Sequence, residues 1–466
     1  MKKLLVILLF LLGSSIFIVC SAQYTKLLNF NGTSGASPRG SLTLSGKVLY
    51  GMSLDGGIGG GCVFSIDTDG SRYKTLLNFN NTNGAYPKGN LTLLSSKLYG
   101  MTSDGGWAGY GCIFSIDTDG SKYKDLLDFN GTNGASPDGS LTLSLSGKLL
   151  YGMTQSGGTL HDGNIFSIDT DGSNFKVLFD FNGTNGSEPW GSLVLSGAKL
   201  YGMTSMGGTY SYGVIFSIDT NGNNYKDLFD FNSSSGKYPF GSLTLSKNKL
   251  YGMTENGGTI DDGIIFSIDT DGSNYKNLFD FNVTNGLGPQ GTLTYVSGLL
   301  FGMAIGGGVY NDGCIFYIDT NGSNYKDMFN FNGADGKEPF GDLTLSGNIL
   351  YGMTSQGGTI GDGVIFKLDT TNIGSSVNQL SGANGQLSVY PNPSNGQFTL
   401  SLSNIKEKCN VEIYNVLGEK VTIATLNQFQ GDYILDLSAQ PYGVYFYRML
   451  NEDGGLVGSG KVVIQK

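Results

Sequence analysis

The sequence is poor in the residues that most catalytic sites and metal centres use. Its 466 residues include a single histidine, His161, only five cysteines and only 14% charged residues. With one histidine, we expect neither Ser-His-Asp or Cys-His catalysis nor a multi-histidine metal site. The net charge of −10, the pI near 4.6 and the lack of any basic run argue against nucleic acid or an anionic membrane as a partner.

A unit of about 50 residues occurs seven times, and a fixed period of this length indicates a solenoid, a propeller or another array. Each unit contains four short runs with period-two alternation, bounded by Gly, Asn, Asp or Pro. In the copy spanning residues 241–282 we predict strands a (242–246), b (250–254), c (264–269) and d (275–281). One face of strand c should carry Ile264, Phe266 and Ile268, and one face of strand d should carry Tyr275, Phe279 and Phe281. Seven such units predict an all-β protein with a seven-bladed β-propeller.

The two ends of the repeat region supply the strands of a single blade. Residues 24–30 form a d strand with no a, b or c before it, and residues 341–370 supply a, b and c with no d after them. Joining these segments would close the ring and cover two sheet edges. An open solenoid is the weaker alternative, because no capping repeat is visible.

Three cysteines occupy one position of the repeat. Cys62, Cys112 and Cys314 begin strand c, where other copies place Val or Ile, so we expect a small apolar packing site. A disulfide between Cys62 and Cys112 is the alternative. Cys409 stands alone in the C-terminal region.

The first 22 residues have the pattern of a secretory signal peptide. Lys2 and Lys3 precede an apolar stretch at 4–19 and a small-residue cleavage site at 20–22, with lipid attachment at Cys20 as the alternative. No later segment approaches the ~20 apolar residues of a transmembrane helix. We therefore expect a secreted or outer-surface protein with a propeller at 23–370, a polar linker at 371–386 and a further domain at 387–466.

The repeat resembles known families. Its strand order, with a Gly-Gly pair after strand b, resembles Kelch-type propellers, and the unit is similar to the GloVer-type tandem repeat of secreted bacterial proteins. This resemblance covers residues 24–370 and implies an architecture rather than an activity.

The C-terminal 80 residues alternate in short runs that predict a small antiparallel β-sandwich. Three motifs occur in order along this region, with the residues Pro391, Asn392, Pro393, Gly443, Tyr445, Gly460, Lys461 and Lys466. With these motifs the region resembles the type A C-terminal sorting domain of the type IX secretion system, which implies recognition by that machinery and export through the outer membrane of a Bacteroidetes-type bacterium. The alternative is a carbohydrate-binding or Ig-like module.

Local motifs give little support for catalysis. The Asp-Thr-Asp-Gly turns after strand c suggest calcium loops, but Asn221 and Asn321 replace the second Asp, and turn capping explains the pattern. The same turns resemble the Asp-box of sialidases, whose arginine triad the two propeller arginines, Arg39 and Arg72, cannot supply. We predict no metal, no cofactor and no catalytic residue. A polysaccharide hydrolase or lyase stays open as an alternative because acidic residues lie on the predicted loops: Asp138, Glu188, Asp261, Asp262 and Glu338.

The b–c and d–a loops should share one face, which we name the longer-loop face. Each d–a loop ends in Pro-x-Gly before the innermost strand, so x should surround the mouth of the central channel. Around the ring, x is Arg39, Lys88, Asp138, Trp190, Phe240, Gln290 and Phe340. The b–c loops add Trp107, Tyr110, His161, Tyr210, Tyr212 and Tyr310.

Exposed aromatic rings among hydrogen-bonding groups suit a sugar or a peptide. We therefore predict a secreted or surface-displayed binding protein that holds a glycan or a protein partner on the longer-loop face. A purely structural surface protein is a further alternative, and it would be favoured if these aromatic side chains were buried.

Overall fold

The computed structural model describes residues 23–370, 387–390, 394–405, 409–415, 420–426, 429–451 and 456–465. The predicted signal peptide and linker lie outside these residues. The chain divides into two compact units, Met1–Asn372 and Ile373–Lys466, and each is described here by itself. Every element of the described residues is a β-strand.

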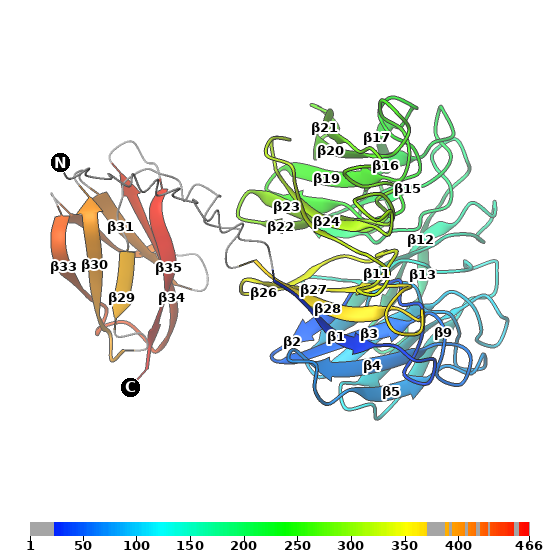
Figure 1. Ribbon diagram of the computed structural model, residues 1–466, viewed down its shortest axis with the longest axis horizontal. Helices are drawn as coiled ribbons and strands as arrows, with labels where there is room; N and C mark the ends of the chain where they lie inside the picture. Colours follow the sequence, from blue (N-terminus) through cyan, green and yellow to red (C-terminus); the bar gives the residue numbers. More distant parts are fainter. Residues whose placement is uncertain are drawn as a thin grey trace, which may run out of the picture. The chain divides into compact units, whose positions relative to one another are not determined.

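Six sheets of the first unit each take four consecutive strands, in the order a, b, c, d (Figure 1). Blades 1 to 3 are β2 (Thr43–Ser45), β3 (Val48–Ser53), β4 (Cys62–Asp67) and β5 (Lys74–Asn78); β6 (Thr92–Leu94), β7 (Lys97–Thr102), β8 (Cys112–Asp117) and β9 (Lys124–Asp128); β10 (Thr142–Leu143), β11 (Leu149–Thr154), β12 (Asn164–Asp169) and β13 (Lys176–Asp180). Blades 4 to 6 are β14 (Val194–Ser196), β15 (Lys199–Thr204), β16 (Val214–Asp219) and β17 (Lys226–Asp230); β18 (Thr244–Ser246), β19 (Lys249–Thr254), β20 (Ile264–Asp269) and β21 (Lys276–Asp280); β22 (Thr294–Val296), β23 (Leu299–Ala304), β24 (Cys314–Asp319) and β25 (Lys326–Asn330).

The seventh blade combines the two ends of the repeat region, as predicted. It consists of β26 (Thr344–Ser346), β27 (Ile349–Thr354), β28 (Val364–Asp369) and β1 (Gln23–Asn29), in the sheet order β1-β28-β27-β26. Strand β1 runs antiparallel to β28, with Gln23 opposite Asp369, and Figure 1 shows the two side by side. The first unit is therefore a seven-bladed β-propeller.

Hydrogen bonds at the innermost strands join the seven blades into a closed ring. The residue after each Pro-x-Gly donates its backbone N–H to the side-chain oxygen of the corresponding residue in the next blade. The seven residues, in order, are Ser41, Asn90, Ser140, Ser192, Ser242, Thr292 and Asp342, and Asp342 donates to Ser41. The preceding glycine permits this approach, because a Cβ on Gly40 would lie 2.2 Å from the carbonyl oxygen of Gly89.

The hydrophobic core lies between neighbouring blades. At the interface of blades 4 and 5, Phe231 meets Phe266 edge-on at 5.3 Å, and Tyr275 stacks on Phe229 at 3.9 Å. Equivalent buried clusters occur at five of the other interfaces, and Tyr24 stacks on Phe329 at 4.2 Å between blades 6 and 7. Burial of these large side chains is the main favourable contribution to folding, and it explains why each unit repeats the same aromatic residues.

The predicted common face of strand d is wrong. Tyr275 packs toward blade 4, whereas Phe279 and Phe281 pack toward blade 6. The pairing of β20 with β21 shifts between Ile265, opposite Phe279, and Phe266, opposite Asn277. This β-bulge inserts one residue and reverses the side-chain alternation along strand d.

The strand c predictions are confirmed. Ile264, Phe266 and Ile268 lie in one interface cluster. Cys62, Cys112 and Cys314 are fully buried and carry free thiols, so the alternative of a Cys62–Cys112 disulfide is wrong. Each thiol fills a space at the start of strand c that Val214, Ile264 and Val364 fill in blades 4, 5 and 7.

The second unit is a small antiparallel sandwich, as predicted. Its strands are β29 (Leu387–Tyr390), β30 (Gln397–Ile405), β31 (Cys409–Tyr414), β32 (Lys420–Leu426), β33 (Phe429–Asp436), β34 (Gly443–Asn451) and β35 (Leu456–Ile464). They form the sheets β29-β30-β33 and β32-β31-β34-β35. Phe398, Val411, Tyr445, Met449 and Ile464 belong to its buried core.

Candidate functional site

The b–c and d–a loops of the propeller lie against each other on one face. In every copy a residue of the d–a loop pairs with a residue of the following b–c loop, as Lys237 does with Asn256 and Leu287 with Gly306. This pairing defines the longer-loop face as the sequence predicts it.

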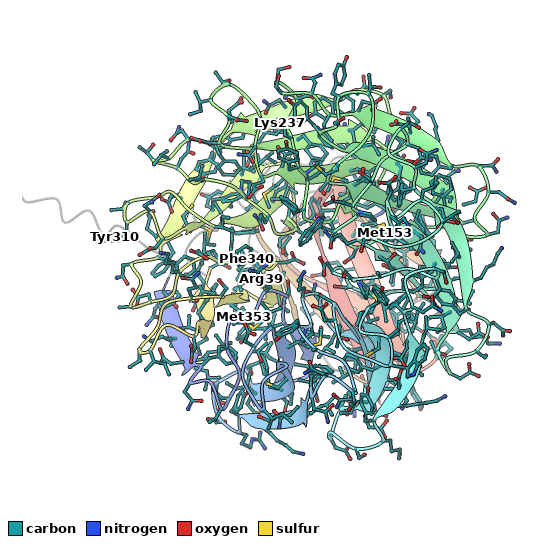
Figure 2. The ribbon with its side chains drawn as sticks, turned by 90° about the vertical axis from the view of Figure 1, so that its right-hand side faces the viewer. Arg39, Met153, Lys237, Tyr310, Phe340 and Met353 are labelled. Atoms are coloured by element: carbon teal, nitrogen blue, oxygen red, sulfur yellow. The ribbon has the colours of Figure 1, made fainter. Side chains whose placement is uncertain are left out.

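The seven x residues of Pro-x-Gly converge on one cavity at the channel mouth. Figure 2 shows Arg39 beside Phe340 near the centre of the propeller, and the Arg39 guanidinium lies 4.8 Å from the Phe340 ring centroid. The cavity measures about 80 Å³, which is well below the 300–1,000 Å³ typical of small-molecule pockets.

Six of these seven side chains contact one another, whereas Gln290 donates a hydrogen bond to Glu255. Lys88 Nζ lies 2.9 Å from Asp138 Oδ1 and 4.9 Å from the Trp190 ring. Trp190 in turn meets Phe240 edge-on at 5.2 Å. Burial raises the pKa of the Asp138 carboxyl, and Lys88 opposes that rise. Ligand binding by these seven residues stays a prediction, and their mutual contacts give them a structural role.

The aromatic residues of the b–c loops lie elsewhere. Figure 2 places Tyr310 at the edge of the propeller, away from Arg39 and Phe340. The loops reach outward because their residues bond to the outermost strand, as Thr209 N–H does to Asp230 Oδ1 at 2.7 Å. The channel-mouth residues and the b–c loop tip at Tyr310 therefore lie apart on the longer-loop face.

The b–c aromatics differ in exposure. Trp107 is 85% exposed, and Tyr110, Tyr210 and Tyr310 are also exposed. His161 is exposed too and adopts a left-handed backbone conformation (φ 66°). Tyr212, by contrast, is half-buried and packs edge-on against Tyr238 at 5.8 Å.

Every blade places one large hydrophobic side chain at the tip of its b–c loop. The seven tips are between 54% and 85% exposed: Ile58, Trp107, Leu160, Tyr210, Ile260, Tyr310 and Ile360. Sequence reasoning missed the four aliphatic tips, because it considered only aromatic and polar residues. Their common offset of one or two residues after the Gly-Gly pair was the available signal.

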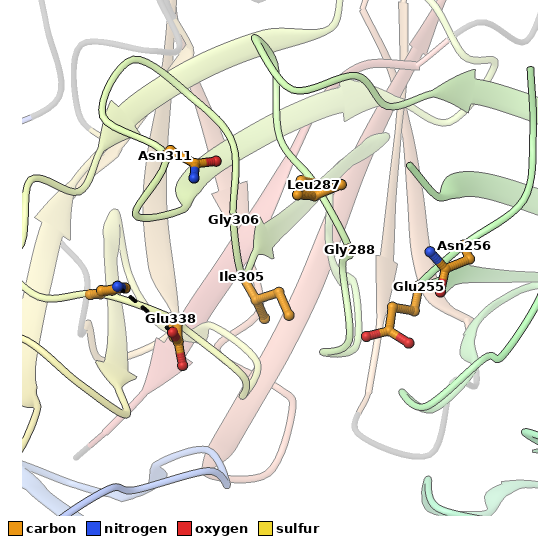
Figure 3. Close-up of a pocket in the computed structure, with 9 residues that line it drawn as sticks. Glu255, Asn256, Leu287, Gly288, Ile305, Gly306, Asn311 and Glu338 are labelled. Atoms are coloured by element: carbon orange, nitrogen blue, oxygen red, sulfur yellow. Dashed lines mark ion pairs between the residues drawn. The ribbon is translucent and has the colours of Figure 1, made fainter. Parts of the chain in front are cut away.

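A larger cavity of about 380 Å³ opens on the same face between blades 5 and 6 (Figure 3). Its lining residues are Glu255, Asn256, Leu287, Gly288, Ile305, Gly306, Asn311, Lys337 and Glu338. Burial raises the pKa of the Glu255 carboxyl, while the hydrogen bond from Gln290 opposes that rise. Of the carboxylates considered from sequence, Glu338 lies here; Glu255 was missed.

The turns after strand c are held by hydrogen bonds from within the turn. Asp69 Oδ1 accepts hydrogen bonds from the backbone N–H and the hydroxyl of Ser71, at 2.9 and 2.6 Å. Asn321 accepts the same two bonds from Ser323, so the turn works without the charge. These contacts agree with the turn-capping interpretation.

One group of described residues has the spacing of a metal site. The side-chain ligand atoms of Cys112, Asp125 and Asp128 lie within 4.8 Å of one another. Burial raises the pKa of the Cys112 thiol to about 12. The burial therefore disfavours the thiolate, which is the form of cysteine that ligates a metal.

The described part of the predicted sorting motif lies on β34 and β35. Tyr445 is buried, and its hydroxyl donates to the carbonyl oxygen of Pro441 at 2.8 Å. Gly460 and Lys461 pair with Tyr447 and Phe446, and Gly443 begins β34. Pro391, Asn392, Pro393 and Lys466 lie outside the described residues.

Comparisons with known proteins match both units. The family described as Gloeobacter/Verrucomicrobia repeat matches residues 14–149, 146–270 and 198–398, and the secretion system C-terminal sorting domain matches residues 388–465. No curated protein sequence matches the chain. Among the described residues, no helix has the length and hydropathy needed to span a bilayer.

Solved structures share the propeller fold. The extracellular domain of a protein described as a hybrid two-component system from B. thetaiotaomicron aligns over 96% of this chain and 59% of its own, at 12% identity and a TM-score of 0.50. An oligogalacturonate lyase from Vibrio parahaemolyticus aligns over 76% of this chain and 94% of its own, at 10% identity and a TM-score of 0.49. The chain thus spans less than two thirds of the first of these structures.

Proposed function

This protein belongs to the Gloeobacter/Verrucomicrobia repeat family and carries a sorting domain that marks proteins for secretion or display at the cell surface, and we propose that it binds carbohydrate there. The interaction with the type IX secretion machinery is implied by the sorting domain. The carbohydrate would lie on the longer-loop face.

The exposed aromatic tips of the b–c loops carry this proposal. Trp107, Tyr210 and Tyr310 place rings that are 85%, 54% and 59% exposed on one face. The face of an aromatic ring packs well against the C–H groups of a sugar, and the polar edge of Tyr or Trp adds a hydrogen bond. The net charge of −10 favours neutral glycans over acidic ones.

A glycan array tests the proposal with the full chain and a Trp107→Ser, Tyr210→Ser, Tyr310→Ser variant. We expect the wild type to bind a set of neutral glycans and the variant to bind at least tenfold more weakly. Leu145→Ser is the matched control, because Leu145 is 84% exposed in the a–b turn, away from the b–c loops. Equal binding by the triple variant would contradict the proposal.

Two alternatives each have one supporting observation. The aliphatic tips Ile58, Ile260 and Ile360 suit an apolar protein surface better than a sugar. Protein binding would be favoured if an Ile260→Ser, Ile360→Ser variant lost a protein partner that the wild type captures but kept its glycan binding.

Glu255 and Glu338 line one cavity, as a polysaccharide hydrolase requires. Release of reducing ends by the wild type, but not by Glu255→Gln, would favour hydrolysis.

A further inference from the structure

The cavity between blades 5 and 6 results from two missing side chains. Gly288 replaces a residue with a side chain in each other copy: Ser37, Tyr86, Ser136, Glu188, Tyr238 and Glu338. Gly306 likewise replaces Asp55, Asp104, Ser156, Met206, Asn256 and Gln356, as the paired positions of the d–a and b–c loops establish.

The backbone conformation at Gly288 is the one that the other copies adopt. Gly288 has φ 61°, and the six equivalent non-glycine residues have φ between 49° and 56°. A Cβ on Gly288 would lie 3.4 Å from Ile305 Cγ1 and 3.6 Å from Glu255 Cγ. A side chain here would therefore extend into the cavity without disturbing the loop. The open space belongs to one copy of the repeat and does not follow from the fold.

The cavity lining combines hydrogen-bond acceptors with an apolar surface. Figure 3 shows Glu255 and Glu338 on opposite sides of the cavity, with Ile305 between them. One oxygen of each carboxylate accepts a hydrogen bond of 2.6 Å, from Gln290 to Glu255 Oε1 and from Gln356 to Glu338 Oε2. Oε2 of Glu255 and Oε1 of Glu338 are left to accept bonds from a ligand.

This composition selects the chemistry of the ligand. Two carboxylates repel an acid or a phosphate. Lys337 Nζ, 3.9 Å from Glu338 Oε1, offsets part of the negative charge that would attract a cation. A neutral molecule with several hydroxyl donors and an apolar C–H face satisfies both the acceptors and the aliphatic surface of Leu287 and Ile305. The volume of about 380 Å³ falls in the range of small-molecule sites.

We propose that the cavity between blades 5 and 6 binds one neutral sugar unit, with Glu255 and Glu338 accepting bonds from its hydroxyl groups. The assignment of carbohydrate rests on the proposed function, but the residues are different. Tyr310 precedes Asn311, which lines the cavity, so a longer glycan would leave the site next to an exposed ring.

Isothermal titration of the full chain tests this site with glucose, galactose, mannose and N-acetylglucosamine, and with their neutral oligomers as a second arm. We expect at least one probe to bind and Gly288→Tyr to weaken it more than tenfold by filling the cavity. Tyr86 and Tyr238 occupy the equivalent position, so the fold accepts the substitution. Ser136→Tyr is the matched control. It places the same side chain at the equivalent position before blade 3, which does not line this cavity, so this variant should bind as the wild type does. Glu255→Gln should weaken binding about tenfold with the shape retained.

The outcomes separate the two proposals. Unchanged binding by Gly288→Tyr, with loss in the Trp107, Tyr210, Tyr310 variant, would overturn the cavity site and leave the proposed function standing. Binding of oligomers but of no monosaccharide, abolished by Gly288→Tyr, would place the end of a glycan in the site. If no probe binds the folded wild type, both proposals fail.

Discussion

The side-chain amide of Asn164 donates a hydrogen bond of 3.1 Å to the backbone carbonyl of Asn133, in the one blade where strand d begins after Phe175 rather than a tyrosine. In the other six blades the tyrosine hydroxyl donates to the equivalent carbonyl, as Tyr123 does to Asn83 at 3.0 Å and Tyr225 to Asn185 at 2.6 Å. In blade 3 an amide donor on strand c has therefore replaced the tyrosine hydroxyl that donates in the other blades.

This exchange predicts energetic coupling between positions 164 and 175. Asn164→Val leaves the Asn133 carbonyl unpaired and should cost about 1–3 kcal/mol in the free energy of unfolding. Phe175→Tyr in that background should recover most of the loss, because the result is the pair found in blade 4. A double-mutant cycle by urea denaturation measures the coupling. Additive effects of the two substitutions would contradict the interpretation.

A second prediction concerns the glycine of the Tyr-Gly-Met motif, which strand b carries in six of the seven copies, as at residues 251–253. A Cβ on Gly252 would lie 2.5 Å from Phe266 Cζ, in the closely packed interface of blades 4 and 5. Gly252→Ala should therefore cost about 1–3 kcal/mol through overpacking. Gly306→Ala is the control, because its nearest atom would be 3.4 Å away, and it should leave the denaturation midpoint almost unchanged. Equal effects of the two variants would disprove the steric argument.

The propeller channel contains a carboxyl group that should make stability depend on pH. Burial raises the pKa of Asp342, against hydrogen bonds from Thr292, Asn90 and Ser41. A raised pKa means that the folded state binds more protons than the unfolded state between the two pKa values. The free energy of unfolding therefore falls as pH rises through that range.

Replacement by asparagine tests this directly, since Asn90 occupies the equivalent position in blade 2. Asp342→Asn should stabilise the protein at pH 7 and have little effect below about pH 4, where the unfolded carboxyl is protonated too. Urea denaturation across this range gives the difference between the two proteins. A constant difference at all pH values would show that the charge is not responsible.

The second unit should respond to pH in the opposite direction. Glu412 lies between Lys420, at 2.6 Å, and Arg448, at 2.5 Å, and these bonds together with that from Tyr414 lower its pKa to about 2. Its stabilisation is complete above the ordinary pKa near 4.5 and is lost as pH falls toward 2. Calorimetry should show a lower melting temperature for Glu412→Gln at pH 6 and a much smaller difference at pH 2, where the folded-state carboxyl is partly protonated.

Much of the fold could be predicted because the same pattern of strands and turns occurs in seven copies. The seven occurrences of the unit of about 50 residues determined the number of blades, and the unpaired segments at 24–30 and 341–370 determined how the ring closes. The bulge in strand d could not be predicted, because Tyr275, Phe279 and Phe281 fit a plain alternation equally well. The register with strand c, which inserts the extra residue, depends on packing between blades.

The candidate site was predicted less completely. The framing of Pro-x-Gly located the seven residues at the channel mouth, but nothing in the chain indicated that Lys88 would pair with Asp138 and lie against the ring of Trp190. The cavity between blades 5 and 6 is a lack of side chains at Gly288 and Gly306. In a chain with 75 glycines, a glycine that creates space is difficult to distinguish from one that permits a turn.

The pairing of β1 with β28 has a consequence for the order of events during biosynthesis. Blades 1 to 6 can assemble as the polypeptide emerges, but the last sheet needs residue 369 beside residue 23. Until then β1 has no neighbour within its own sheet, and the nascent ring keeps two unpaired edges. Ring closure therefore requires the whole repeat region, and a chain truncated before β28 would present open edges that favour aggregation and proteolysis.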